Sequence, residues 1–275
     1  MSQPHPQTSA LVMAARRPGV TDPLCAMGDV SHKCMLHIHG QIMLERVIAA
    51  LLDSGCVARV YVSIDDAAVL RDGERLRDWL AAGTVQAVAA EGNLADSVLA
   101  AARQIPDAGW PLLITTGDNA LHTAELIRDF VQQGCDAAGD AALGLTRECD
   151  VTPEIPDSNL NWHWLRDGGF SSCNLYLLHS RKALSGVSIF RSGGQFGKKH
   201  WRILKAFGLL PFVLYKFKLT STDRLIRRIG RNLGLRMHAV FLPYAYGPID
   251  VDNPKSFALS ERLLAARERP SANQT

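Results

Sequence analysis

Short apolar runs alternate with amphipathic stretches along the first half of the sequence, and this alternation restricts the fold more than any other feature. Apolar runs occur at 10–15, 57–64, 85–89 and 111–116. Between them, apolar residues recur at helical spacing. Strands that alternate with helices form βαβ units, which build a parallel sheet with helices on both faces. The sequence therefore predicts an α/β fold with a mainly parallel central sheet covered by helices on both faces.

The second half of the chain continues this pattern less regularly. We expect further strands at 135–146, 170–178 and 235–242. The helices expected over the whole chain are 41–54, 66–82, 94–104, 123–133 and 254–267. No linker or internal repeat divides the sequence, so we expect a single domain at 10–268 with disordered tails at 1–9 and 269–275.

Residues 191–236 form a strongly basic segment that we expect to be a helical elaboration of the domain. They include twelve Lys and Arg residues and one acidic residue, Asp223, whereas the whole chain has a net charge of +3. Bulky apolar residues are interleaved with the basic ones, a pattern typical of helices at an anionic membrane surface. A helical insert that packs on the core with a solvated basic face fits the pattern equally well. No nucleic-acid-binding motif accompanies the charge, so we expect no nucleic acid as a partner.

The cysteines and the absence of long apolar runs indicate where the protein works. None of the six cysteines forms a CxxC pair, and the N-terminal stretch is polar and rich in proline. No apolar run reaches the roughly 20 residues that span a bilayer. We therefore expect a reduced cytoplasmic setting, with attachment to the inner face of the membrane if the basic segment binds lipid.

The loop from Ala14 to Lys33 is the first candidate site, because it follows a predicted buried strand. A turn after such a strand offers backbone N–H donors to phosphates, and Arg16, Arg17 and Lys33 add positive charge. The loop has neither GxxxxGK[ST] nor GxGxxG, which excludes a P-loop and disfavours a dinucleotide fold. A surface loop with solvated cations remains the alternative.

Acidic residues at two other places could complete a phosphate site by holding Mg²⁺. Asp118 follows the predicted strand 111–116, and Asp250 and Asp252 precede the last helix. Mg²⁺ in proteins takes one or two carboxylates together with substrate phosphates. Capping of the following helix is the alternative for Asp118 and for Asp252 or Asn253.

Three motifs in this order resemble the MobA-like nucleotidyltransferase family. They are AARRPG with the later HKCML, then TTGDNAL, then GPIDVDNPKSFALSERLL. The resemblance implies a Rossmann-like GT-A nucleotidyltransferase fold and transfer of a nucleoside monophosphate from an NTP to a phosphorylated acceptor, with release of pyrophosphate. The family's glycine pair is replaced by alanines here, and the residue after the acidic turn is Ala120 where the family has proline.

The same resemblance implies roles for individual residues. Those expected in catalysis are Arg17, Lys33 and Asp118; those expected to bind the nucleotide are Ala14, Ala15, Arg16, Gly19, Asn93 and Ser97; and those expected to bind Mg²⁺ are Asp118, Asp250 and Asp252. Asn174 is expected to face the acceptor. Turn and capping chemistry is the alternative for Asn93 and Ser97, and a polar position at a strand start is the alternative for Asn174.

The expected substrates are an NTP, with CTP or GTP favoured, and a phosphorylated small molecule or lipid. The basic segment has no counterpart in the small members of the family that act on molybdopterin, and it leads us to include a lipid head-group precursor among the acceptors. A GT-A glycosyltransferase that uses a nucleotide-sugar and a non-catalytic nucleotide-binding protein are the alternatives.

Overall fold

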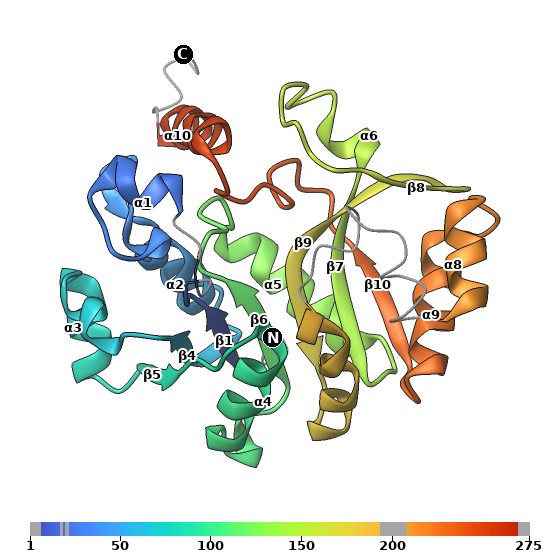
Figure 1. The fold of residues 1–275 in the computed structure, drawn as a ribbon, viewed down its shortest axis with the longest axis horizontal. Helices are drawn as coiled ribbons and strands as arrows, with labels where there is room; N and C mark the ends of the chain where they lie inside the picture. Colours follow the sequence, from blue (N-terminus) through green and yellow to red (C-terminus); the bar gives the residue numbers. More distant parts are fainter. Residues whose placement is uncertain (1–6, 17–18, 20–21, 193–207, 269–275) are drawn as a thin grey trace, which may run out of the picture.

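The computed structural model describes residues 7–16, 19, 22–192 and 208–268, and Figure 1 shows its fold. The strands of its main sheet are β1 (Thr8–Met13), β4 (Val57–Ile64), β5 (Val85–Ala89), β6 (Leu112–Thr116), β7 (Ala141–Arg147), β8 (His163–Leu165), β9 (Gly168–Leu178) and β10 (Met237–Phe241). Within the described residues their order is β10-β7-β9-β6-β1-β4-β5, with β8 paired to β9 outside this path. A short hairpin of β2 (His37–Ile38) and β3 (Gln41–Ile42) is separate from this sheet.

The sheet is mainly parallel, as the sequence predicts. β1 pairs in parallel with both β4 and β6, and β10 pairs in parallel with β7. β9 is the exception in the middle of the sheet, because it runs antiparallel to both β6 and β7. Ala10, Leu11 and Val12 of β1 have no exposed surface, which is typical of a strand covered on both faces.

Helices cover both faces of the sheet. On one face, α2 (Met43–Asp53), α3 (Glu74–Ala81) and α5 (Ala124–Asp136) contribute to a core cluster with β1 and β4. On the other face, α4 (Leu94–Gln104) and the 3₁₀ helix η4 (Arg181–Ser192) pack against the sheet. α1 (Pro23–Gly28), α6 (Glu148–Val151) and α10 (Pro254–Glu268) contribute to a third cluster, and they lie toward the top of Figure 1.

Several predicted boundaries differ from the structure; α5 (Ala124–Asp136), for example, occupies the start of the strand expected at 135–146, and β7 begins at Ala141. β1 begins at Thr8, so Thr8 and Ser9 belong to the sheet and not to a disordered tail. Thr8 donates from its backbone N–H and its hydroxyl to the carbonyl of Cys56, which satisfies both polar groups at the start of the strand. The helix expected at 66–82 is interrupted: a 3₁₀ helix, η2 (Ala67–Arg71), precedes α3. Gly73 caps α3, and a Cβ atom there would lie 2.7 Å from Glu45 Oε1.

The described part of the basic segment contains two helices, α8 (Leu209–Lys216) and α9 (Thr222–Asn232). They lie beside β10 at one edge of the sheet, and β5 lies at the other edge (Figure 1). The stretch 193–207 of that segment lies outside the described residues. So do residues 1–6 of the tail expected at 1–9 and the whole of the tail expected at 269–275.

Candidate active site

The carboxyl ends of the parallel strands bring the predicted site residues to one edge of the sheet. Met13, the last residue of β1, pairs with Ser63 of β4 and with Thr116 of β6. The loop after β1, the residue after β4 and the acidic turn after β6 therefore meet at this edge. Ligands bind at the same place in open α/β sheets.

The acidic turn after β6 is held against β1 by its backbone. Gly117 donates its N–H to the carbonyl of Met13 at 2.9 Å. A Cβ atom at Gly117 would lie 3.2 Å from Cys34 Cβ and 3.4 Å from Ala14 Cβ, so glycine allows this close approach. The N-cap of α5 is Thr123, whose side chain accepts from the N–H of Leu126. Capping of α5 therefore does not account for Asp118.

The segment before α10 packs beside this turn. Val251 donates its N–H to the carbonyl of Asp118 at 3.0 Å, which brings Asp250 and Asp252 next to Asp118 although they are far apart in sequence. Asn253 caps α10, because its side-chain oxygen accepts from the N–H groups of Lys255 and Ser256. Asn253 is therefore the residue that caps α10, and capping does not account for Asp250 or Asp252.

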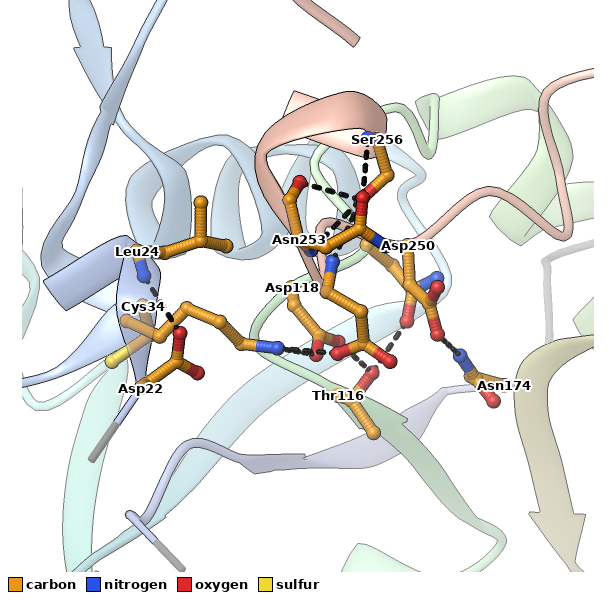
Figure 2. Close-up of polar contacts among 12 residues, drawn as sticks. Asp22, Leu24, Cys34, Thr116, Asp118, Asn174, Asp250, Asn253 and Ser256 are labelled. Carbon is orange, nitrogen blue, oxygen red and sulfur yellow. Dashed lines mark hydrogen bonds and ion pairs between the residues drawn. The ribbon is translucent and has the colours of Figure 1, made fainter. Parts of the chain in front are cut away.

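Lys33 lies between two of the three aspartates. It begins the 3₁₀ helix η1 (Lys33–Met35), and its Nζ atom is 2.7 Å from Asp118 Oδ2 and 2.6 Å from Asp252 Oδ1. Figure 2 shows Asp118 and Asp250 on neighbouring segments, with the side chain of Asn174 directed at Asp250. The predicted residues Lys33, Asp118, Asp250 and Asp252 therefore form one cluster, which we call the acidic cluster.

The charges of the acidic cluster shift the pKa values of two of its members. Burial by itself lowers the pKa of Lys33, but the neighbouring carboxylates of Asp118 and Asp252 outweigh it, and the net pKa is raised. Burial and the two other carboxylates raise the pKa of Asp250 to about 7. Asp250 therefore lacks sufficient positive charge around it, even with Lys33 nearby.

Asn174 is brought to the acidic cluster by an irregularity in β9. The register between β7 and β9 shifts at Gly144/Leu145, opposite this part of β9, and Asn174 has a φ of +53°. Bulges of this kind re-aim side chains, and asparagine tolerates the left-handed conformation better than most residues. The side-chain N–H of Asn174 donates to Asp250 Oδ2 at 3.2 Å. The bulge therefore places this predicted acceptor-side residue beside the carboxylates.

Thr116 and Asn119 are part of the same turn and were not among the predicted site residues. The hydroxyl of Thr116 lies 2.5 Å from Asp118 Oδ1 and 2.5 Å from Asn119 Oδ1, so its single proton is shared between two acceptors. Asn119 has no exposed surface, and its Nδ2 atom has no hydrogen-bond partner among the described residues. Thr116 therefore contacts Asp118 directly, and Asn119 contacts Thr116. The position of Thr116 at the end of a predicted strand was the signal that could have identified it.

The loop after β1 is fixed by a network that the sequence analysis also missed. Arg16 donates to Asp65 from its backbone N–H at 3.0 Å and from Nε at 2.8 Å, and His32 Nε2 lies 3.0 Å from Asp65 Oδ1. Ser31 Oγ is 2.8 Å from the other ring nitrogen of His32. Burial opposes ionisation of Asp65, but the hydrogen bonds from Arg16 dominate and lower its pKa to about 2. Asp65 follows directly after β4, so its place at a strand end could have identified it.

The residues predicted to bind phosphate in the loop from Ala14 to Lys33 differ in their contacts. Ala14 donates its N–H to the carbonyl of Ser63 at 2.9 Å, and Arg16 uses its N–H for Asp65, so neither donor is free in this conformation. Ala15 and Gly19 are exposed, and Gly19 has a φ of +71°. Arg17 lies outside the described residues. The phosphate contacts of this loop therefore stay predictions.

Asn93 and Ser97 lie at the start of α4, after β5. Both have the turn and capping contacts that were the alternative to a role in nucleotide binding. Asn93 accepts from the N–H of Asp96 at 3.0 Å, and Ser97 Oγ accepts from the N–H of Glu91 at 2.8 Å. In the described part of the chain no hydrogen bond joins either residue to the acidic cluster. Their role in base recognition stays a prediction.

Comparison with known proteins identifies the domain to which this site belongs. Residues 26–156 match the model of the MobA-like NTP transferase domain. The chain contains a MobA-like NTP transferase domain. This match confirms the family resemblance and makes the protein a nucleotidyltransferase enzyme. It includes Lys33 and Asp118 and ends before Asn174 and the Asp250–Asp252 segment. No protein of curated function shows significant sequence similarity to the transferase.

Solved structures show the same fold at low sequence identity. A hypothetical transferase from Thermus thermophilus has a TM-score of 0.73 at 18% identity, over 92% of this chain and 99% of that one. A CMP:2-keto-3-deoxy-manno-octonic acid synthetase complexed with CTP has a TM-score of 0.58 at 16% identity, over 94% and 100%. A 4-diphosphocytidyl-2C-methyl-D-erythritol synthase from Anaerococcus prevotii has a TM-score of 0.56 at 13% identity, over 96% and 100%. These similarities confirm the predicted Rossmann-like nucleotidyltransferase fold.

Proposed function

We propose that the protein transfers a nucleoside monophosphate from an NTP to a phosphorylated acceptor, with Mg²⁺ as cofactor and pyrophosphate as the second product. The observation that supports this most is the acidic cluster at the carboxyl edge of the sheet. It combines carboxylates for a cation with a lysine for a polyphosphate, and these are the two requirements of phosphoryl chemistry. CTP is the first candidate, because two proteins of similar fold are named for CTP or a cytidyl product.

The acidic cluster fits a divalent cation in charge and in donor type. Three ionised carboxylates and one ammonium leave a net charge of −2, and the raised pKa of Asp250 reflects this deficit of positive charge. Mg²⁺ takes one or two carboxylates and completes its shell with water and substrate phosphates. Among the described residues no three His, Cys, Asp or Glu side chains form a ready metal site.

Asp118 and Asp250 would hold the cation. Lys33 pairs with both Asp118 and Asp252, but the Asp252 side chain is 49% exposed and that of Asp118 is 17% exposed. When bound there, Mg²⁺ would neutralise charge on the phosphates. Lys33 would exchange its carboxylate partners for the triphosphate and neutralise the charge that develops on pyrophosphate, together with Arg17. Asp65 and His32 would keep Arg16 and the phosphate loop in position. A phosphate nucleophile is already anionic, so no general base is needed.

Asn174 would orient the acceptor from the opposite side of Asp250. The acceptor we propose is a phosphorylated small molecule or a phosphorylated lipid or lipid head-group precursor. A lipid acceptor would place the enzyme in the cytoplasm at the inner face of the membrane.

The first test is thermal unfolding with CTP, GTP, UTP or ATP in the presence of Mg²⁺, which needs no knowledge of the acceptor. The preferred NTP should raise the melting temperature of the wild type by mass action. Asp118→Asn should abolish this rise, and Asp53→Asn, which changes an exposed carboxylate at the end of α2, should keep it.

The second test is release of pyrophosphate from the preferred NTP with phosphorylated acceptors. A glycosyltransferase would release none and would be stabilised by a nucleotide-sugar instead. If Asp118→Asn leaves Mg²⁺-dependent nucleotide binding unchanged, the proposed site is wrong.

A further inference from the structure

A pocket of about 340 Å³ lies between α8 and α9, and arginines dominate its lining. It is lined by Leu210, Leu214, Thr220, Arg224, Arg227, Arg228 and Arg231. On α9 the last three arginines follow Arg224 by three, four and seven residues, so the four form a single stripe along one face of the helix. We call this feature the arginine pocket.

The arginines of this pocket have few anionic partners. Arg227 pairs with Asp223 at 2.8 Å, and within the described ranges none of the other three forms an ion pair. The Nε atom of Arg228 is buried and has no hydrogen-bond partner in the same part of the structure. Like charges on one helix face repel, and a buried guanidinium nitrogen without an acceptor is costly. A phosphate in the pocket would relieve both.

Exposed apolar side chains accompany the arginine pocket. Leu209 is 67% exposed, Phe217 is 62% exposed and Leu219 is 59% exposed. Leu210, which lines the pocket, is 45% exposed. All four belong to α8 or to the turn that follows it. Large apolar side chains grouped beside a basic stripe are the features of a surface that enters the head-group region of a bilayer.

This surface lies on the acceptor side of the molecule. The hydroxyl of Tyr215 in α8 is 2.8 Å from His163 Nδ1 in β8, and Arg166 donates its N–H to the carbonyl of Thr220 at 3.1 Å. β8 pairs with β9, the strand that carries Asn174. In Figure 1, α8 and α9 lie next to β10, across the sheet from β5 and α3.

We propose that α8, α9 and the turn between them dock on the surface of an anionic phospholipid membrane, with lipid phosphates in the arginine pocket. The apolar side chains of α8 and its following turn enter the head-group region. The contact is peripheral, and no helix in the described part of the chain is long and apolar enough to cross a membrane. Docking is independent of the transfer reaction, whereas its use to reach a lipid acceptor rests on the proposed function.

The experiment is flotation of the full-length protein with vesicles of phosphatidylcholine alone or mixed with phosphatidylglycerol, at low and high salt. Wild type should float only with the anionic vesicles and should be released by salt. Each basic side chain near an anionic surface contributes about a fivefold factor in binding, so the triple variant Arg224→Gln, Arg228→Gln, Arg231→Gln should bind about a hundredfold more weakly.

The matched control is the triple variant Arg59→Gln, Arg71→Gln, Arg103→Gln, which removes the same charge from exposed positions on β4, η2 and α4. It should bind vesicles like the wild type. A double variant, Phe217→Ser with Leu219→Ser, should weaken binding to the anionic vesicles at low salt although it keeps every basic side chain. Both arginine triples should keep the thermal shift with NTP, which separates failure of docking from failure of the proposed function.

Three results would overturn the proposal: no flotation of the wild type with anionic vesicles, equal weakening in the two arginine triples, or binding that is indifferent to vesicle charge. Circular dichroism and urea unfolding of each variant show whether a loss of binding reflects a loss of folding.

Discussion

Replacement of Asp250 by asparagine should make the folded protein more stable and inactive at the same time. The carboxylate of Asp250 is partly buried beside Asp118 and Asp252, and it accepts one hydrogen bond, from Asn174. Asparagine has nearly the same shape, and its carbonyl can accept the same hydrogen bond. The substitution removes one of three crowded negative charges without opening a cavity.

The size of the effect follows from the pKa of Asp250, which rises from 3.8 to about 7 on folding. Between these values the folded state holds a proton that the unfolded state has lost, so stability falls as the pH rises through this range. At about 1.36 kcal/mol for each pKa unit, the full cost above pH 7 is about 4 kcal/mol. Relaxation of the ion pairs of Lys33 reduces it, so this figure is a ceiling.

The assay is urea unfolding of wild type and Asp250→Asn with a chelator, at about pH 8 and about pH 4. The variant should be more stable by as much as about 4 kcal/mol at the higher pH, and the difference should nearly vanish at the lower one. Mg²⁺ should stabilise the wild type and leave the variant unchanged, because it binds only the folded wild-type site. Asp53→Asn, an exposed control, should change stability by less than about 0.5 kcal/mol.

If Asp250→Asn is no more stable than the wild type at the higher pH, the carboxylates are not crowded as the structure shows. The charge argument for a cation site would then lose its basis.

Three further predictions concern neighbouring residues. Lys33→Met should destabilise the protein at neutral pH, because it leaves three carboxylates without their ammonium partner. In calorimetry, NTP without Mg²⁺ should not raise the melting temperature of this variant. A melting temperature equal to that of the wild type without NTP would contradict the ion pairs. Asp65→Asn frees Arg16, so KM for the NTP should rise several-fold more than kcat falls; equal effects on both kinetic constants would argue against a positioning role. The wild type should lose stability as the pH falls from 3.8 through about 2, and the variant should already lack part of that stability at neutral pH. Burial lowers the pKa of His122 to about 4 from 6.5, so the wild type should lose stability as the pH falls through this range. His122→Gln can keep the hydrogen bond to the carbonyl of Gly247 and should flatten that loss in acid titrations monitored by fluorescence.

The fold was largely predictable because the strands under the site are buried on both faces. β4 and β5 have the predicted bounds, since a short run rich in apolar residues that is followed by a helical period has few other solutions. The direction of β9 was not predictable, because an 11-residue strand of alternating burial looks the same whichever way it runs. At the start of α3, after Gly73, Leu76 donates its N–H to Glu45 Oε1 at 3.3 Å, a distant contact that no local pattern contains.

The site residues that follow directly after strands could be predicted from the sequence. The contacts between residues far apart in the sequence could not. Asp118 stood out as an acidic residue just after a buried strand, and Asp250 as one that capping could not explain. The position of Lys33 between Asp118 and Asp252 could not be foreseen, because it depends on how the segment before α10 returns to the sheet. The network of Arg16, His32 and Asp65 joins two loops across β1 and β4 in the same way.

The antiparallel course of β9 has a consequence for how such an enzyme can diversify. β9 is an inner strand of the sheet, whereas β10, the next strand in the described part of the chain, lies at the edge beside β7. Insertions or exchanges between β9 and β10 do not interrupt β1, β4 or β6, the strands that precede the residues proposed to bind the triphosphate. On the proposed function, the part that binds the nucleotide can stay constant while the segment between β9 and β10 is exchanged. A chimera that carries another enzyme's segment between these strands should keep its choice of base and adopt a new acceptor.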